Sequence, residues 1–391
     1  MHAMTKTVPE LFGATEGELE ATKAIWTARE IAQQPQMLRR THALVAELHA
    51  QLQDFVAPIA DNPAARVILA GAGTSAYLGQ CLAPLLDRRL AARVDAVPTT
   101  DLVSAPQLHL DPAQPLLLIS FGRSGNSPES IAAVELAESL VREVRHLVVT
   151  CNAQGQLANV PVRQAMTVQL PEETHDTSFA MTSSFSCMMY AAVAALLPAG
   201  ALDARIEPIA RATEAVIADA LPLLRSLAKA HHGRVVYLGS GLFQGLAREA
   251  TLKLGELTNG AVATCYDSPL GFRHGPKTFV TGDTLVMVFV SNDPYTRRYD
   301  HDLIDELRRD GVAARVIEIS ARPRDAASGD TLAVPGLAEA ADVDLLWPYI
   351  AAAQIYAFLH ARVRGVTPDN PNPAGIVNRV VQGVQLYALE A

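Results

Sequence analysis

Short apolar runs alternate with amphipathic segments in the first half of the chain. The run RVILA at residues 66–70 predicts a buried strand, and residues 71–86 predict a turn followed by a helix. Further strands are expected at residues 94–97, 116–120 and 146–150, and a helix at residues 127–144 with an apolar face of Ile131, Val134, Ala137, Val141 and Val144. Strands that alternate with helices indicate a parallel, doubly wound α/β sheet.

The second half repeats this pattern at an offset of 168 residues. RVILAGAGTSAYLGQCLAPLL, from Arg66, resembles RVVYLGSGLFQGLAREATLKL, from Arg234, and the segment at Pro115 matches DTLVMVFVSNDPYTR at Asp283. Two matches at one offset favour an internal duplication, although any α/β protein offers similar strand–turn–helix pieces. We therefore expect two tandem, flavodoxin-like α/β domains.

The segments around this repeat complete the predicted organisation. Residues 1–50 are polar and helix-prone, with helically spaced apolar positions from residue 37, and predict a helical arm. The first domain is expected at residues 51–205 and the second at residues 215–366, joined near residues 203–215. Residues 367–391 are expected to form an irregular, proline-rich tail.

Composition narrows the classes of partner. The chain has 391 residues, enough for two domains, and its net charge of −9 weighs against a nucleic-acid partner. It shows neither an apolar run long enough for a bilayer nor the pattern of a signal peptide, so we expect a cytoplasmic protein without a membrane partner. The four cysteines are scattered, which predicts neither a disulfide framework nor a metal site.

A serine-rich loop, residues 120–127, follows the strand expected at 116–120. Ser127 and Pro128 are typical of a helix start, but that role leaves Ser120, Ser124 and Gly125 unexplained. A helix N-terminus offers free N–H groups, glycine allows a close approach, and hydroxyls can donate to oxygen, so this serine loop predicts a phosphate site. Arg123 either adds positive charge there or is solvated at the loop tip.

The sequence around the serine loop indicates which class of phosphate ligand would bind there. The P-loop pattern G-x-x-x-x-G-K-[ST] is absent, and hydroxyls without lysine suit one terminal phosphate, as on a sugar phosphate. The turn GAGTSA, residues 71–76, matches the dinucleotide fingerprint, with Asp95 near the expected acid position. Against a nicotinamide cofactor, Thr74 and Ser75 place two more hydroxyls beside the serine loop, so we expect no cofactor.

The second half has lost the serine loop and carries carboxylates instead. FVSNDPYTRRY stands where the first half has SFGRSGNSPES. Glu249 and Glu256 are seven residues apart on a helical pattern and share a face, beside apolar positions that could raise a carboxylate pKa and favour a general base. Two surface carboxylates paired with Lys253 or Arg248 are the simpler alternative on spacing alone.

The motifs together resemble the sugar isomerase (SIS) domain family over about residues 20–385. The resemblance rests on GAGTSA and SFGRSGNSPES, and extends through PEETHDTSFAMTSSFS, EATLKLGELTNG and SPLGFRHGPK. Within the family the chain is most similar to galactosamine-6-phosphate deaminase/isomerases, also called tagatose-6-phosphate ketose/aldose isomerases. It is more distantly similar to the isomerase half of glucosamine-6-phosphate synthase.

The resemblance implies roles for residues in both halves. The substrate-binding residues would be Thr74, Ser75, Ser124, Ser127, Thr182 and Ser183, although the last two also suit a helix N-cap cluster. Glu256 matches the base that moves a proton between C1 and C2 of the open-chain sugar, and Glu249 a supporting acid. His274 matches a ring-opening histidine supplied by the partner subunit, which implies a homodimer with shared active sites.

Two departures from the synthase relatives favour deamination. The tail segment NPAGIVNRVV has no lysine where the synthase has one, with Asn378 near that position and Arg379 beside it, and no glutaminase domain supplies ammonia. We therefore expect isomerising deamination of galactosamine 6-phosphate. The alternatives are an aldose–ketose isomerase without deamination, and a sugar-phosphate sensor, which would not need both Glu256 and His274. His175 and Asp176 receive no role from the sequence.

Overall fold

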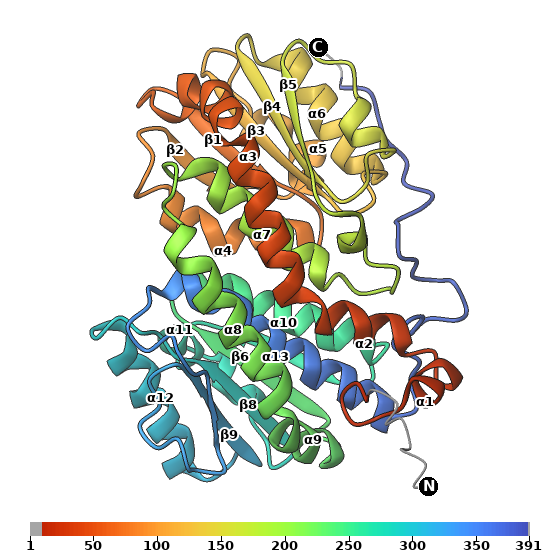
Figure 1. Ribbon diagram of the computed structural model, residues 1–391, viewed down its shortest axis with the longest axis vertical. Coiled ribbons are helices and arrows are strands. Elements are labelled where there is room, and N and C mark those ends of the chain that lie inside the picture. The colour runs from red at the N-terminus through yellow and green to blue at the C-terminus, as the bar shows by residue number, and fades with distance from the viewer. Residues whose placement is uncertain (1–9, 390–391) are drawn as a thin grey trace, which may run out of the picture.

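Two parallel sheets form the two halves of the molecule, and the computed structural model describes residues 10–389 (Figure 1). The first sheet has the strand order β2-β1-β3-β4-β5, and the second has the order β7-β6-β8-β9-β10. The strands of the first are β1 (Arg66–Ala70), β2 (Arg93–Ala96), β3 (Leu116–Gly122), β4 (Val144–Thr150) and β5 (Ala165–Gln169). Those of the second are β6 (Arg234–Gly239), β7 (Ala263–Asp267), β8 (Thr284–Phe289), β9 (Arg315–Ser320) and β10 (Thr331–Ala333).

The two sheets repeat each other in register as well as in order. Arg66 pairs with Leu116 in the first sheet, and Arg234 pairs with Thr284 in the second, at the offset expected from the sequence. The glycines that start the first helix of each half, Gly73 and Gly241, both have φ +56°. The predicted duplication and the two-domain α/β fold are confirmed.

Helices cover both sheets and fill the space between them. In the first half they are α4 (Thr74–Leu86), α5 (Thr99–Ser104), α6 (Pro128–Leu140) and α7 (Ser183–Leu196). In the second half they are α8 (Asp203–Asp219), α9 (Leu221–Lys229), α10 (Leu242–Leu257), α11 (Pro269–Phe272), α12 (Thr296–Asp310) and α13 (Asp342–Val363). Short 3₁₀ turns lie at Pro106–Leu108, Gln156–Asn159, Glu172–Thr174 and Pro276–Phe279.

One apolar core joins the halves. It runs from α3 and α7 through α4 and α10 to α13, which is buried along almost its whole length. Helices α4 and α10 approach closely because Gly245 has no side chain; a Cβ there would lie 2.7 Å from the backbone nitrogen of Cys81. This contact brings the first turn of α4 to the C-terminal half of α10, where Gly73 lies near Leu252 and Thr74 donates to Glu249. None of the described helices is long and apolar enough to cross a membrane.

The predicted helical arm is present as α1 (Glu16–Ala21), α2 (Ile25–Ala32) and α3 (Gln34–Ala60), and residues 1–9 of that segment lie outside the described residues. Helix α3 crosses the boundary expected at residue 50, and α8 occupies the expected junction at residues 203–215. After α13 the tail is irregular and runs along the edge of the first half toward β5 (blue in Figure 1). Residues 390 and 391 of the tail also lie outside the described residues.

The helix expected at residues 127–144 ends earlier than predicted. Helix α6 stops at Leu140, and Val141 has extended backbone angles. Val144 already belongs to β4, where it pairs with Leu116. The prediction was wrong over the last four positions because buried Val141 and Val144 continue the apolar spacing of the helix into the turn and the next strand.

Candidate active site

The serine loop lies at the carboxyl end of β3, where the chain turns into α6. Gly125 has φ +65°, and a Cβ on it would lie 3.2 Å from the Cα of Gly155. Asn152 donates its side-chain amide to the Ser124 carbonyl at 2.8 Å, and the Leu157 N–H donates to the Gly125 carbonyl at 2.8 Å. The turn at residues 152–157 thus holds the loop in one shape, with glycine required where the two backbones meet.

This loop borders a small cavity of about 110 Å³, which we call the serine-loop cavity. Its wall combines the first turn, the serine loop, the segment before α7 and the tail. The lining residues are Ala72, Ser75, Phe121, Gly122, Arg123, Ser124, Gly125, Ser127, Ser130, Met181, Arg379, Val380 and Val381. The structure therefore brings five predicted binding residues together at the N-terminus of α6, and their contact with substrate stays a prediction: Ser75, Arg123, Ser124, Gly125 and Ser127.

Two details of the loop correct the sequence analysis. Ser127 is the N-cap residue of α6, but its hydroxyl does not cap the helix and instead donates to Glu129 at 2.8 Å. Arg123 is not solvated at a loop tip: its side chain is buried and donates to the carbonyls of Ser178, Phe179 and Arg379 at 3.0–3.1 Å. Burial lowers the pKa of Arg123 to about 10, which leaves the guanidinium charged at neutral pH.

Four predicted binding residues lie outside the cavity wall: Thr74, which is described below with α10, and the three residues Ser120, Thr182 and Ser183. Ser120 is buried under the loop, with no hydrogen-bond partner for its hydroxyl among the described residues. Thr182 is the N-cap residue of α7, and Ser183 donates its hydroxyl to Asp176. The buried carboxylate of Asp176 also accepts the backbone N–H of Thr182 at 2.7 Å and that of Ser184 at 2.9 Å. Asp176 therefore caps α7, and contact of these three residues with substrate stays a prediction.

The tail closes one side of the cavity. The Arg379 guanidinium donates to the backbone carbonyl of Asp176, with Nε at 3.1 Å, while its own carbonyl accepts from Arg123. Val380 and Val381 continue the wall. Arg379 thus lines the serine-loop cavity, whereas Asn378, the residue near the lysine position expected from the resemblance, is exposed and donates to the Gly375 carbonyl.

A buried charged cluster on α10 lies next to this cavity. Thr74, the first residue of α4, donates its hydroxyl to Glu249 at 3.2 Å, and the adjacent Ser75 lines the cavity. The Lys253 Nζ lies 3.5 Å from the same Glu249 oxygen and donates to Glu256. We call Glu249, Lys253 and Glu256 the carboxylate–lysine cluster.

Burial sets the electrostatics of the cluster. Glu249 and Lys253 are 0% and 1% exposed, whereas the Glu256 side chain is 24% exposed. Burial raises the pKa of Glu249 to about 8 against the opposing effect of Lys253. Burial also acts against the Lys253 charge, but both carboxylates outweigh it and raise the Lys253 pKa. The cluster thus favours a protonated Glu249 beside a Lys253–Glu256 ion pair.

The sequence named Lys253 only as the partner in a surface ion pair, so its place in the site was missed. The predicted pairing of Lys253 with a glutamate was right. The prediction that this pair lies on the surface was wrong, because α4 covers this face of α10. The available signal was a lysine between two glutamates at i−4 and i+3 on a helix whose other buried positions are apolar except for Thr251. Arg248 instead stacks on Tyr77, with its Cζ 4.4 Å from the ring centre.

The remaining candidates lie apart from this region. His274 follows α11, has an exposed side chain, and does not line the serine-loop cavity. Asp95, considered as a dinucleotide acid, is paired with Arg66 at 2.7 Å and with Arg93 at 3.0 Å. Across residues 10–389, no three His, Cys, Asp or Glu side chains are grouped in a way that could hold a metal ion.

Known proteins resemble the chain throughout its length. The SIS domain model matches residues 62–198 and 226–357. The D-galactosamine-6-phosphate deaminase AgaS of Escherichia coli O157:H7 is 45% identical over 375 residues, covering 95% of this chain and 98% of the relative. The D-galactosamine-6-phosphate deaminase AgaS of Shewanella sp. ANA-3 is 46% identical over 372 residues, covering 93% and 92%.

A solved structure agrees with this pattern. The crystal structure of tagatose-6-phosphate ketose/aldose isomerase from Escherichia coli superposes with a TM-score of 0.84 and 42% identity, covering 94% of this chain and 97% of the other. The two SIS matches contain the two sheets and most of their helices, and α8 lies between the two matches. The chain therefore belongs to the SIS domain family.

Proposed function

We propose that the protein is an enzyme that converts galactosamine 6-phosphate into tagatose 6-phosphate and ammonia. The observation that carries this proposal is the direct connection between a phosphate-sized cavity and a buried acid–base cluster. Ser75 lines the cavity while its neighbour Thr74 is hydrogen-bonded to Glu249. The two similar deaminases named above support the choice of an amino sugar.

The serine-loop cavity would hold the phosphate. The hydroxyls of Ser75 and Ser124 can donate to phosphate oxygens, and that of Ser127 can do so once it turns away from Glu129. The α6 N-terminus and Arg123 add positive potential. The cavity volume of about 110 Å³ suits a phosphate group rather than a whole sugar phosphate. The sugar would therefore extend from the cavity toward α10, because Thr74 and Glu249 lie next to Ser75.

Glu256 is the proposed base. It takes the proton from C2 of the open-chain amino aldose, which gives an enolamine, and returns a proton to C1 to form a C2 imine. Water then adds to C2, the C–N bond breaks, and ammonia leaves with the ketose as the second product. The partial exposure of Glu256 allows access to substrate, and Lys253 fixes its carboxylate.

Glu249 would supply a proton-bearing group beside the reacting carbons. Its pKa of about 8 keeps the carboxyl largely neutral at pH 7, so that it can donate a hydrogen bond as oxygen atoms on the substrate gain charge. This arrangement separates a neutral acid from a charge-paired base on one helix. The separation is what an aldose–ketose proton transfer needs.

The same proposal includes a homodimer in the cytoplasm. His274 is exposed and away from the cavity of its own chain, so a second copy would have to bring it to the site for ring opening. The four cysteines, of which three are buried, form no disulfide, which suits a reducing compartment. Sedimentation of the purified protein tests the dimer, and mixed His274→Ala and Glu256→Gln dimers test the sharing of sites. Recovery of activity in the mixture is the expected result.

Ammonia release tests the reaction. The purified protein is given galactosamine 6-phosphate, glucosamine 6-phosphate or their N-acetyl forms, without an added cofactor. We expect ammonia from galactosamine 6-phosphate in preference to the others. If no ester releases ammonia although the folded protein binds sugar phosphates, the deaminase proposal is wrong.

An aldose–ketose isomerase without deamination is the second candidate. It uses the same cavity and base, and the similar structure from Escherichia coli is named as such an enzyme. The two candidates differ only in whether C2 carries nitrogen or oxygen. Tagatose 6-phosphate as substrate distinguishes them. Rapid conversion of it to an aldose phosphate, together with no release of ammonia from any amino-sugar phosphate, supports the isomerase.

A further inference from the structure

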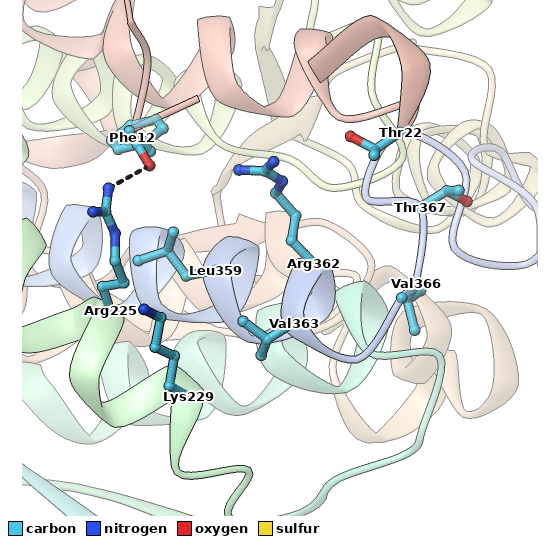
Figure 2. A pocket seen from close by; sticks show the side chains of 11 residues that line it. Phe12, Thr22, Arg225, Lys229, Leu359, Arg362, Val363, Val366 and Thr367 are labelled. Carbon is cyan, nitrogen blue, oxygen red and sulfur yellow. Dashed lines mark hydrogen bonds between the residues drawn. The ribbon is translucent and has the colours of Figure 1, made fainter. Parts of the chain in front are cut away.

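A second cavity, of about 330 Å³, lies beside the root of the C-terminal tail (Figure 2). Its wall comes from the start of the described chain, the end of α9, the end of α13 and the first residues of the tail. The lining residues are Phe12, Gly13, Thr22, Arg225, Lys229, Leu359, Arg362, Val363, Gly365, Val366 and Thr367. We call it the tail-root cavity. It shares no lining residue with the serine-loop cavity.

Three cations gather on this cavity although the chain is acidic overall. Figure 2 shows Arg225, Lys229 and Arg362 around Leu359, with the Arg225 guanidinium donating to the Phe12 carbonyl at 3.2 Å. Within residues 10–389, none of the three has a carboxylate oxygen within 4.0 Å. By contrast, Arg39 on α3 is paired with both Glu207 and Glu214.

The Arg362 guanidinium is placed in an electrostatically unfavourable position. Its Nε is buried and has no hydrogen-bond partner among the described residues. Burial and the nearby Arg225 lower its pKa, while Glu18 attracts it from a distance. The Glu18 carboxylate itself accepts from the Thr15 N–H at 2.8 Å and its hydroxyl at 2.9 Å in a capping box. An anion in the cavity would relieve both the unpaired donor and the repulsion between arginines.

Gly13 makes room for the second arginine. A Cβ on Gly13 would lie 1.5 Å from the Arg225 Nη2, and its φ of +72° also favours glycine. The two threonines of the wall do not offer free donors, because Thr22 donates to the Glu18 carbonyl and Thr367 to the Asn370 carbonyl. Recognition of a ligand would therefore depend on the cations. Between and beside the cations, Leu359, Val363 and Val366 present an apolar wall.

We propose that the tail-root cavity binds a small phosphate monoester, whose phosphate is held by Arg225, Lys229 and Arg362 and whose carbon body lies on the apolar wall. Guanidinium forks match phosphate oxygens, and lysine adds a mobile charge. This site is separate from the proposed substrate site and does not depend on the proposed reaction.

The C-terminal tail connects the tail-root cavity to the serine-loop cavity. The tail leaves the tail-root cavity at Thr367, and the Asp369 carboxylate then accepts from Thr27 N–H at 2.8 Å and from Trp26 N–H at 3.2 Å at the start of α2. The same tail then reaches the serine-loop cavity, where Arg379, Val380 and Val381 form part of the wall. A ligand at the tail root would thus contact the segment that closes the substrate site.

Phosphate titration tests this site. Inorganic phosphate and glycerol 3-phosphate are titrated calorimetrically into the full chain carrying Ser124→Ala and Ser127→Ala, which weaken the serine-loop cavity. We expect one remaining site for both probes. Adding Lys229→Gln and Arg362→Gln should weaken it about tenfold or more, because two charge-assisted interactions are lost. Arg88→Gln, an exposed cation outside both cavities, is the matched control and should leave it unchanged.

Three results would overturn the proposal. One is the absence of a remaining site in the serine-loop variant, and another is unchanged affinity when Lys229 and Arg362 are replaced. The third is binding of inorganic phosphate without glycerol 3-phosphate, which would remove the role of the apolar wall. Lys229 is exposed, so Lys229→Gln alone provides the comparison if Arg362→Gln impairs folding; a several-fold loss is expected from it.

Discussion

Replacing Lys253 with methionine removes the ammonium group that lies between Glu249 and Glu256. The side chain is 1% exposed, and its Nζ lies 3.5 Å from Glu249 while donating to Glu256. Methionine has a similar volume, so the space stays filled and the change is mainly one of charge. The variant therefore reports how much the buried ion pair contributes to folding and to the proposed base.

The magnitude follows from the state of each carboxylate. Breaking a buried ion pair by removing one partner costs about 3–5 kcal/mol when the other charge is left unpaired. Here burial already raises the pKa of Glu249 to about 8, and Glu256 is partly open to water. Both effects reduce the penalty, so we expect a loss of about 2–3 kcal/mol in the free energy of unfolding.

Urea unfolding and ammonia release together measure the effect. Turnover should fall about a hundredfold or more, because the Glu256 carboxylate loses the group that positions it. Arg211→Met is the matched control: Arg211 pairs with Glu207 at the same i,i+4 spacing as Glu249 and Lys253, but its side chain is 74% exposed. If both variants leave stability and turnover at the wild-type values, the reasoning about burial is refuted.

Three further variants test other parts of the site. The folded state holds a proton on Glu249 up to about pH 8, against 4.5 for the ordinary carboxyl, so its contribution to stability falls as pH rises between these values. Glu249→Gln should flatten the fall in unfolding free energy across that range, and an unchanged slope in urea titrations would contradict this. Gly125→Ala strains a residue at φ +65° and should raise KM for the sugar phosphate about tenfold; an unchanged KM would argue against the loop as the phosphate site. Arg123→Lys keeps the charge but loses the fork that holds three carbonyls, so limited proteolysis should cut the tail faster, and equal cleavage rates would count against that role.

The duplication and the position of the serine loop could be predicted because local patterns determine them. Gly73 and Gly241 take the same backbone angles, so the same turn chemistry starts α4 and α10. The helix start at Pro128 was also predicted at the right residue. The use of the Ser127 hydroxyl was not, because Glu129 lies two residues away and competes with the helix backbone for it.

Long-range packing decided what the sequence could not show. Arg123 is buried because its carbonyl partners come from segments about 55 and 256 residues away, a distance beyond any local pattern. The pairs Glu207–Arg211 and Glu249–Lys253 share one spacing, yet only the second is buried. Asp176 likewise caps α7 although it lies six residues before Thr182, whose backbone N–H it accepts. Each case depends on which surfaces meet in the folded chain.

The measurement that tests the central claim most directly is turnover of galactosamine 6-phosphate by Glu256→Gln. Ammonia release and sugar-phosphate binding are compared with those of the unmodified protein. We predict that ammonia release is lost while binding in the serine-loop cavity remains, because glutamine keeps the shape but cannot accept the C2 proton. Ammonia release at the unmodified rate by this variant would contradict the assignment of Glu256 as the base.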